Sequence, residues 1–92
     1  MRIVWTLRAW SDIDRLHAFL ADNDLDTADA LFDRLSHAPE ALLNFPRRGP
    51  RFSELDPREV REYRVGGYLL RYELAGTDIV VLRFFHARED RP

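Results

Sequence analysis

Residues 58–85 read REVREYRVGGYLLRYELAGTDIVVLRFF, and this stretch decides the fold. It contains three runs rich in β-branched and aromatic residues, Arg58–Val65, Tyr68–Leu74 and Asp78–Phe85, separated by tight-turn signals. Gly66-Gly67 is a two-residue hairpin signal, because primed turns need a positive φ that glycine adopts freely. The stretch therefore predicts three consecutive antiparallel strands.

The residues before this stretch predict one more strand and two amphipathic helices. Residues 2–6 are short, β-branched and aromatic, which is typical of a strand. Apolar residues then recur every three or four positions in two segments, which predicts an antiparallel helical hairpin. Pro39 lies inside the second segment and predicts a kink or a restart of the helix. The first apolar stripe is Leu7, Trp10, Ile13, Leu16, Phe19 and Leu20, and the second is Ala28, Leu31, Phe32, Leu35, Ala38 and Leu42.

The predicted fold is a single α+β domain covering residues 1–92, with the element order β-α-α-β-β-β. We expect the helical hairpin to pack on one face of a mainly antiparallel four-stranded sheet. A chain of 92 residues has room for one small domain. The sequence does not say where the first strand joins the sheet.

The composition excludes several classes of function. The absence of cysteine excludes a disulfide scaffold, a thiolate metal site and a thiol nucleophile. The longest apolar runs are four residues, far below the ~20 that a membrane-spanning helix needs. No Walker loop, GxGxxG motif or Ser-His-Asp spacing is present. We therefore expect a soluble cytoplasmic protein with no membrane partner and no cofactor.

The charges are unevenly placed along the chain. The net charge is −2, and all 14 basic residues are arginines. Residues 1–44 hold four arginines against eight acids, whereas residues 45–92 hold ten against eight. An anionic partner is therefore expected to bind the second half of the chain.

Alternation along the predicted strands places three arginines on the sheet face away from the helices. Arg64, Arg71 and Arg83 are expected to share this uncovered face, with Leu69 and Phe85 exposed beside them. In the last strand the same rule separates two sets of side chains, Val80, Leu82 and Phe84 on one face and Ile79, Val81, Arg83 and Phe85 on the other.

Two interpretations of these arginines remain open. Like charges on neighbouring strands repel by about 0.2–1 kcal/mol per facing pair, so the cluster favours an anionic ligand such as phosphate, nucleic acid or an acidic peptide. The alternative is a solvated cross-strand ladder in which Glu62 and Glu73 neutralise the arginines. The exposed apolar neighbours favour the first interpretation.

The three histidines do not predict a metal site. His17 and His37 lie on different predicted helices and His86 ends the last strand, so no i, i+4 pair shares a face. His17 and His37 are interpreted as helix-surface residues. His86 has two interpretations, a general base toward a hydroxyl group or a residue that packs at the end of the sheet.

The order of these segments resembles the RelE/ParE superfamily, the toxins of bacterial type II toxin–antitoxin modules. The resemblance covers nearly the whole chain and depends on order and spacing more than on any single motif. It implies a cognate antitoxin as partner, and we expect an acidic amphipathic antitoxin segment on the arginine-rich half. The matching pieces are Val4-Trp5-Thr6, Ala9, Asp12-Ile13, Phe45-Pro46, Gly49, Arg61, Tyr63, Tyr68–Tyr72, Ile79–Arg83, His86-Ala87-Arg88 and Asp90.

The superfamily contains two activities. RelE-like members are ribosome-dependent endoribonucleases that cut mRNA without a metal, whereas ParE-like members bind and inhibit DNA gyrase. The RelE-type arginine after the tyrosine of the third strand is replaced by Leu69, no tyrosine follows Tyr72, and the chain has no lysine. These absences favour the ParE-like activity, so the resemblance implies a gyrase inhibitor in the first place, with a metal-independent endoribonuclease as the alternative. A third interpretation is an inactive member that only binds its antitoxin.

The resemblance and the strand pattern together name candidate site residues. A ribonuclease would use His86 as the base and Arg71 or Arg83 on the phosphate. A gyrase inhibitor is expected to bind its target through Arg64, Arg71, Arg83, His86 and Arg88. The antitoxin is expected on Leu69, Phe85, Arg71 and Arg83. Because Arg83 is placed outward, its truncation to alanine is expected to leave stability nearly unchanged.

Overall fold

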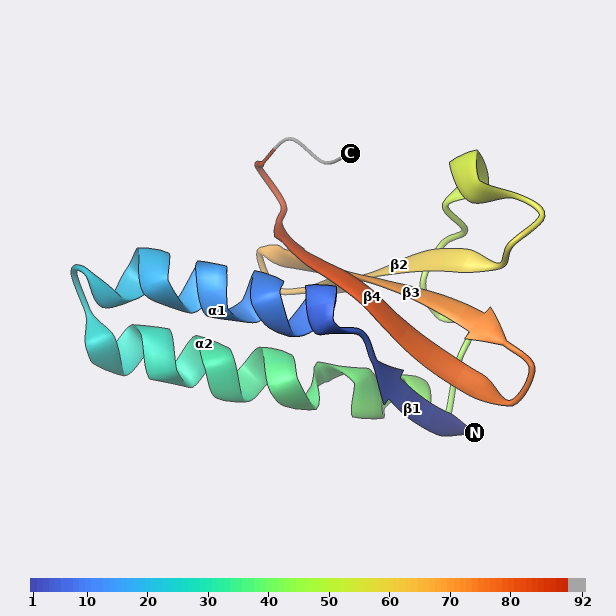
Figure 1. Ribbon diagram of the computed structural model, residues 1–92, viewed down its shortest axis with the longest axis horizontal. Coiled ribbons are helices and arrows are strands. Elements are labelled where there is room, and N and C mark those ends of the chain that lie inside the picture. The colour runs from blue at the N-terminus through green and yellow to red at the C-terminus, as the bar shows by residue number, and fades with distance from the viewer. Residues whose placement is uncertain (90–92) are drawn as a thin grey trace.

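The computed structural model describes residues 1–89 and has two layers, a helical hairpin and a four-stranded sheet (Figure 1). The predicted α+β fold and its element order are confirmed. The last matching piece of the resemblance, Asp90, lies outside the described residues. The elements are β1 (Arg2–Trp5), α1 (Leu7–Ala21), α2 (Leu25–His37), β2 (Val60–Val65), β3 (Tyr68–Ala75) and β4 (Asp78–His86), with the short 3-10 helices η1 (Ala38–Leu42) and η2 (Ser53–Leu55).

The sheet has the strand order β1-β4-β3-β2. β2, β3 and β4 form the predicted antiparallel meander. β1 lies at the edge beside β4 and runs parallel to it, from the pair Arg2 and Asp78 to the pair Trp5 and Val81. Because β1 ends at Trp5, the last residues of β4 extend beyond their neighbouring strand.

Local signals set the ends of the helices. The Thr6 hydroxyl accepts a hydrogen bond from the Ala9 backbone N–H at 3.1 Å and caps α1. Asp24 caps α2 in the same way, at 3.1 Å from the Thr27 N–H. α2 ends at His37, and a 3-10 turn that contains Pro39 follows, so the predicted restart is confirmed. None of the helices in residues 1–89 is long and apolar enough to cross a membrane.

The main core lies between the helices and the sheet. Ile13 and Leu16 from α1 meet Leu35 from α2 over the sheet, as the two apolar stripes predict. The stripe of α1 continues further than the core does, because the hairpin projects past the end of the sheet (Figure 1). Phe19 lies on this projecting part and is 77% exposed. Leu7, at the first turn of α1, is also exposed.

A β-bulge in β4 overturns part of the predicted alternation. The pairing with β3 shifts between Arg71 and Tyr72, so that Arg71 faces Arg83 whereas Tyr72 faces Val81. The extra residue, Leu82, reverses the side-chain direction within the strand. Ile79, Val81 and Phe84 therefore all lie in the helix-side core, and the prediction that separated Phe84 from Ile79 and Val81 is wrong.

Candidate functional site

The sheet face away from the helices is covered around Leu69, Arg71 and Phe85, and the expectation that these residues lie on an uncovered face is wrong. Leu69 is 7% exposed and Phe85 2%, and Arg71 is also buried. The chain between η1 and β2 folds along the free edge of β2, where the Phe52 N–H donates to the Val60 carbonyl at 2.7 Å. From there the Phe52 ring covers the guanidinium of Arg71, 4.1 Å from the ring centroid. This face is therefore a small second core.

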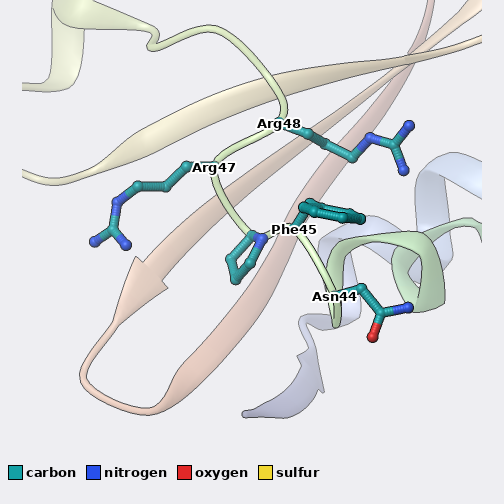
Figure 2. A pocket seen from close by; sticks show the side chains of 5 residues that line it. Asn44, Phe45, Arg47 and Arg48 are labelled. Carbon is teal, nitrogen blue, oxygen red and sulfur yellow. The ribbon is translucent and has the colours of Figure 1, made fainter.

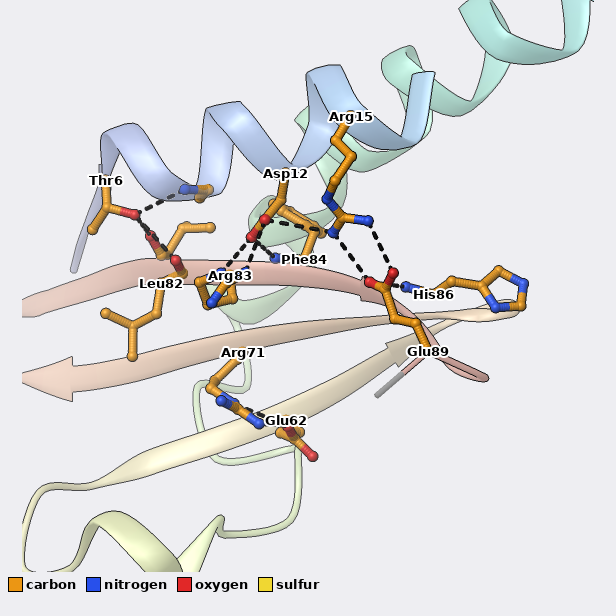
Figure 3. Close-up of polar contacts among 12 residues, drawn as sticks. Thr6, Asp12, Arg15, Glu62, Arg71, Leu82, Arg83, Phe84, His86 and Glu89 are labelled. Carbon is orange, nitrogen blue, oxygen red and sulfur yellow. Dashed lines mark hydrogen bonds and ion pairs between the residues drawn. The ribbon is translucent and has the colours of Figure 1, made fainter. Parts of the chain in front are cut away.

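Arg71 is held inside this second core. Its guanidinium donates to Glu62 Oε2, from Nε at 3.0 Å and from Nη2 at 2.9 Å (Figure 3). It also stacks on Phe85, 5.0 Å from the ring centroid. The ladder interpretation holds for Glu62, whereas Glu73 pairs with Arg58 at 2.7 Å and not with one of the three arginines.

Arg83 is bound to α1, and the expectation of a free surface arginine is wrong. Its guanidinium donates to both oxygens of Asp12, at 2.6 Å and 3.1 Å. The Asp12 carboxylate is buried and also accepts the Phe84 backbone N–H at 3.0 Å. Since β1 ends at Trp5, this N–H lies on an edge that no strand covers, and Asp12 satisfies it instead. Figure 3 shows Asp12 reaching from α1 to β4.

A second ion pair holds the chain after β4. Arg15 binds Glu89 through two hydrogen bonds of 2.9 Å and 3.1 Å, and it also lies 3.5 Å from Asp12. Glu89 in turn accepts the His86 backbone N–H at 3.1 Å. We call residues 86–89 the C-terminal turn. α1 therefore fixes both the edge of β4 and the C-terminal turn that follows it.

The ring of His86 is set by a backbone contact. Its Nδ1 accepts the Arg88 backbone N–H at 3.1 Å, and the ring meets Tyr68 edge-on at 5.2 Å between centroids. When the imidazole is neutral, its proton must then be on Nε2. His86 therefore offers a hydrogen-bond donor at Nε2 and no lone pair there.

The loop before β2 is fastened by residues that carry the family resemblance. The Tyr72 hydroxyl donates to the Pro46 carbonyl at 2.6 Å, and burial raises the pKa of this phenol. Arg61 donates to the Gly49 carbonyl at 2.8 Å. A Cβ on Gly49 would lie 2.5 Å from the Glu62 carbonyl oxygen, so only glycine fits there. These motif residues hold the loop against the sheet.

Arginine contacts favour the ionised form of two glutamates, Glu59 and Glu73. Hydrogen bonds from Arg47 and Arg61, at 2.8 Å and 2.9 Å, lower the pKa of Glu59. The hydrogen bonds from Arg58 lower the pKa of Glu73 in the same way. Most of the described arginines in the second half of the chain are thus paired with carboxylates of the molecule itself.

Among the predicted site residues, three remain at the surface. Arg64 and Arg88 are exposed, and neither has a carboxylate within ion-pair distance in residues 1–89. His86 is half-buried. The Ala87 N–H donates to the Gly67 carbonyl at 2.8 Å, which places the C-terminal turn beside the β2–β3 turn. In the described part of the chain, no group of three His, Cys, Asp or Glu side chains could hold a metal ion.

Two cavities were not predicted from the sequence. One, of about 520 Å³, is lined by residues 44–48, where Arg47 and Arg48 extend to opposite sides (Figure 2). The other, of about 600 Å³, lies where the hairpin projects past the sheet, and we call it the corner groove. The corner groove is lined by Arg15, Leu16, Phe19, Leu20, Tyr68, His86, Arg88 and Glu89.

This architecture, a helical hairpin on a β1-β4-β3-β2 sheet with a short C-terminal turn, agrees with the fold that the resemblance to the RelE/ParE superfamily implies. A family model described as "ParE toxin of type II toxin-antitoxin system, parDE" matches residues 3–91. The chain belongs to this family. Its class of partner is therefore a cognate antitoxin.

Known proteins support the same assignment. Toxin ParE3 of Caulobacter vibrioides is 31% identical over 88 residues, 95% of this chain and 87% of that protein. Toxin RelE1 of the same organism is 28% identical over 97% of this chain and 96% of its own length. A solved structure titled "Chromosomal ParDE TA system from P. aeruginosa" has the same fold, with a TM-score of 0.77 at 18% identity, over 96% of this chain and 97% of that one.

Proposed function

We propose that this toxin inhibits DNA gyrase by binding to it and does not cleave RNA. The observation that carries the proposal is the internal use of the three candidate catalytic groups. Arg71 is bound to Glu62, Arg83 is bound to Asp12, and Nδ1 of His86 is bound to the Arg88 N–H. The proposal places this activity in the cytoplasm, under the control of a cognate antitoxin.

Metal-independent RNA cleavage needs a base with a free lone pair and cations aimed at the phosphate. Neutral His86 in this arrangement carries its proton on the outward nitrogen, Nε2, so it cannot accept one from a ribose hydroxyl. Arg83 lies at the junction with α1, and Arg71 lies beneath Phe52. A phosphate would have to displace Glu62 from Arg71, or Asp12 from Arg83, before that arginine could stabilise it.

A binding function needs only complementary surface. Arg64, Arg88 and His86 are the predicted target-binding residues that remain accessible, and an exposed guanidinium suits an acidic patch on a large partner. We therefore assign target binding to these three residues. The other two predicted residues, Arg71 and Arg83, are bound to Glu62 and Asp12 and are assigned a structural role.

The test is a supercoiling assay with purified gyrase and relaxed plasmid. The toxin is expected to inhibit supercoiling, and Arg64→Glu and Arg88→Glu are expected to weaken the inhibition. Arg8→Glu is the matched control, because Arg8 is an exposed arginine at the start of α1. Each variant is first checked for its unfolding temperature.

The alternative activity is tested in parallel, since one relative at 28% identity is named RelE1. Translating ribosomes with a defined mRNA are incubated with the toxin, and the message is mapped by primer extension. Intact mRNA together with inhibited gyrase supports the proposal. Codon-dependent cuts with unaffected gyrase would reverse it, and no effect in either assay would favour an inactive, antitoxin-binding member.

A further inference from the structure

We infer that the β2–β3 turn and three arginines around it form a contact surface for the phosphate backbone of duplex DNA. The three are Arg34, Arg64 and Arg88, and we call this surface, with Gly66 and Gly67 at its centre, the arginine tip. The inference rests on the proposed function in one respect, since the duplex is the DNA that gyrase holds. It adds Arg34, a residue that the sequence did not indicate.

Arg34 reaches the turn from the helical layer. It lies on α2 and is exposed. A Cβ on Gly66 would lie 3.0 Å from the Arg34 Cζ atom and closer still to Nη2, so the guanidinium lies directly against this glycine. Gly66 also has a φ of +60°, which residues with a side chain rarely adopt. This glycine therefore both makes the turn and leaves room for the Arg34 side chain.

The other two arginines reach the turn from different sides. Arg64 precedes Gly66 by two residues and lies on the sheet face away from the helices. Arg88 follows Ala87, whose N–H donates to the Gly67 carbonyl at 2.8 Å. Figure 1 shows the β2–β3 turn at the end of the sheet where the chain leaves β4. Three segments that are far apart in the sequence thus bring one arginine each to the same turn.

The positive charge of the arginine tip is not matched by acids within residues 1–89. None of its three arginines has a carboxylate within ion-pair distance there. The acids that lie near them along the chain already contact other basic side chains, in the pairs Glu62–Arg71, Glu89–Arg15 and Asp33–His37. The arginine tip therefore keeps a local excess of positive charge, although the whole chain has a net charge of −2.

The chemistry of the arginine tip suits a phosphate backbone. A guanidinium presents paired N–H donors whose geometry matches phosphate oxygens. No atom lies within 4 Å of the position that a Cβ on Gly67 would take, so the backbone between the arginines is open to a ligand. Glycine lets a ligand approach the backbone closely. A protein partner would be expected to need a large aromatic or apolar anchor at the centre of the contact, which the two glycines do not offer.

A DNA duplex fits the arginine tip better than single-stranded RNA does. Single strands are bound largely through bases that stack on aromatic rings. The turn itself contains no aromatic residue, and the ring of Tyr68, which follows it, is half-buried and packs edge-on against His86 at 5.2 Å. Contacts to the backbone of duplex DNA need cations and no stacking.

The test is fluorescence anisotropy of the full-length toxin with a short labelled DNA duplex over a range of salt concentrations. Three phosphate contacts predict a slope of about −2.7 in log K against log salt, or about a 40-fold loss of affinity between about 50 and 200 mM salt. Arg34→Gln, Arg64→Gln and Arg88→Gln are each expected to make this slope shallower by about 1. Each variant is expected to keep the unfolding temperature of the wild type, because the side chains are exposed.

Arg8→Gln is the matched control. Arg8 is exposed in the first turn of α1, and it has no carboxylate within ion-pair distance in the described part of the chain. Its loss is expected to leave the slope unchanged. A wild-type slope near zero, or equal changes for Arg8→Gln and Arg34→Gln, would overturn the inference.

Two further ligands separate the kinds of anionic partner. Equal or tighter binding of single-stranded RNA would overturn the assignment to a duplex. Polyglutamate that competes as well as unlabelled DNA would overturn it in favour of an acidic protein surface. Normal supercoiling together with DNA binding that the three variants weaken would refute the gyrase proposal and leave the DNA contact standing. Inhibited supercoiling without DNA binding would do the reverse.

Discussion

Phe84 and Phe85 are neighbours in β4, yet their rings lie in two different cores. Phe84 is fully buried under the helices, with Trp5 stacked against it at 5.6 Å. Phe85 is as deeply buried on the opposite face, where its ring meets the guanidinium groups of Arg71 and Arg83 at 5.0 Å and 4.7 Å. The helix side is closed by apolar side chains, and the outer side by charged groups and a loop.

The difference teaches how this fold uses arginine. On the outer face a guanidinium covers an aromatic ring with its flat surface while its N–H groups bind a carboxylate at the edge. Arg71 does both, with Phe52 and Phe85 as rings and Glu62 as the acid. Such arginines belong to the structure, and a ligand site must be sought among those that remain at the surface.

The sharpest test of this comparison is to remove each ring in turn. Phe84→Ala is expected to lower the free energy of unfolding by about 3–5 kcal/mol, because the helix-side core cannot collapse around the cavity. Phe85→Ala is expected to cost less, about 2–3 kcal/mol, because the flexible guanidinium groups and the loop can move inward. Urea denaturation measures both values. Equal losses would mean that the two cores are equally rigid.

The next largest effect concerns Asp12, the residue of α1 that binds Arg83 and the Phe84 N–H of β4. Asp12→Ala leaves the Arg83 guanidinium and the Phe84 N–H without their buried acceptor. We expect a loss of about 3 kcal/mol in the free energy of unfolding. Asp14→Ala is the control, since Asp14 is an exposed acid on the same helix and is expected to change stability by less than about 0.5 kcal/mol. Similar losses for the two variants would contradict the role of Asp12 as the buried acceptor for Arg83 and the Phe84 N–H.

The sequence-based expectation that Arg83→Ala leaves stability nearly unchanged is replaced by a measurable loss. Its loss is expected to cost about 1–2 kcal/mol, because the ion pair to Asp12 and the contact with Phe85 are both removed. The cost stays below that of Asp12→Ala, since Asp12 keeps Arg15 and the Phe84 N–H. Arg64→Ala, on the exposed part of the outer face, is expected to leave thermal unfolding nearly unchanged.

The smallest expected effect is a pH dependence of stability that comes from Glu59 and Glu73. Arginine contacts lower the pKa values of Glu59 and Glu73 in the folded state. Their contribution to stability is therefore complete above the ordinary glutamate value of 4.5 and is lost as the pH falls through the lower folded values. The unfolding temperature of the wild type is expected to fall below about pH 4.5 more steeply than that of Glu59→Gln/Glu73→Gln. Parallel curves would show that other carboxylates dominate.

The sequence by itself determined the fold class, because its signals are local. Strand alternation, the Gly66-Gly67 turn and the helix caps at Thr6 and Asp24 each depend on residues a few positions apart. The same local signals, in order along the chain, also identified the superfamily. They say which side of an element is apolar but not what covers it.

Tertiary structure alone decided the rest. It placed β1 at the edge beside β4, inserted the bulge at Leu82, and brought Asp12 to Arg83 across 71 residues. An arginine side chain is long enough to reach several acids, so its partner depends on how the elements pack and not on the period of its strand. For the same reason the accessible cations could be identified only from the structure. The corner groove depends on how far the hairpin projects past the sheet, and local sequence signals do not give that offset.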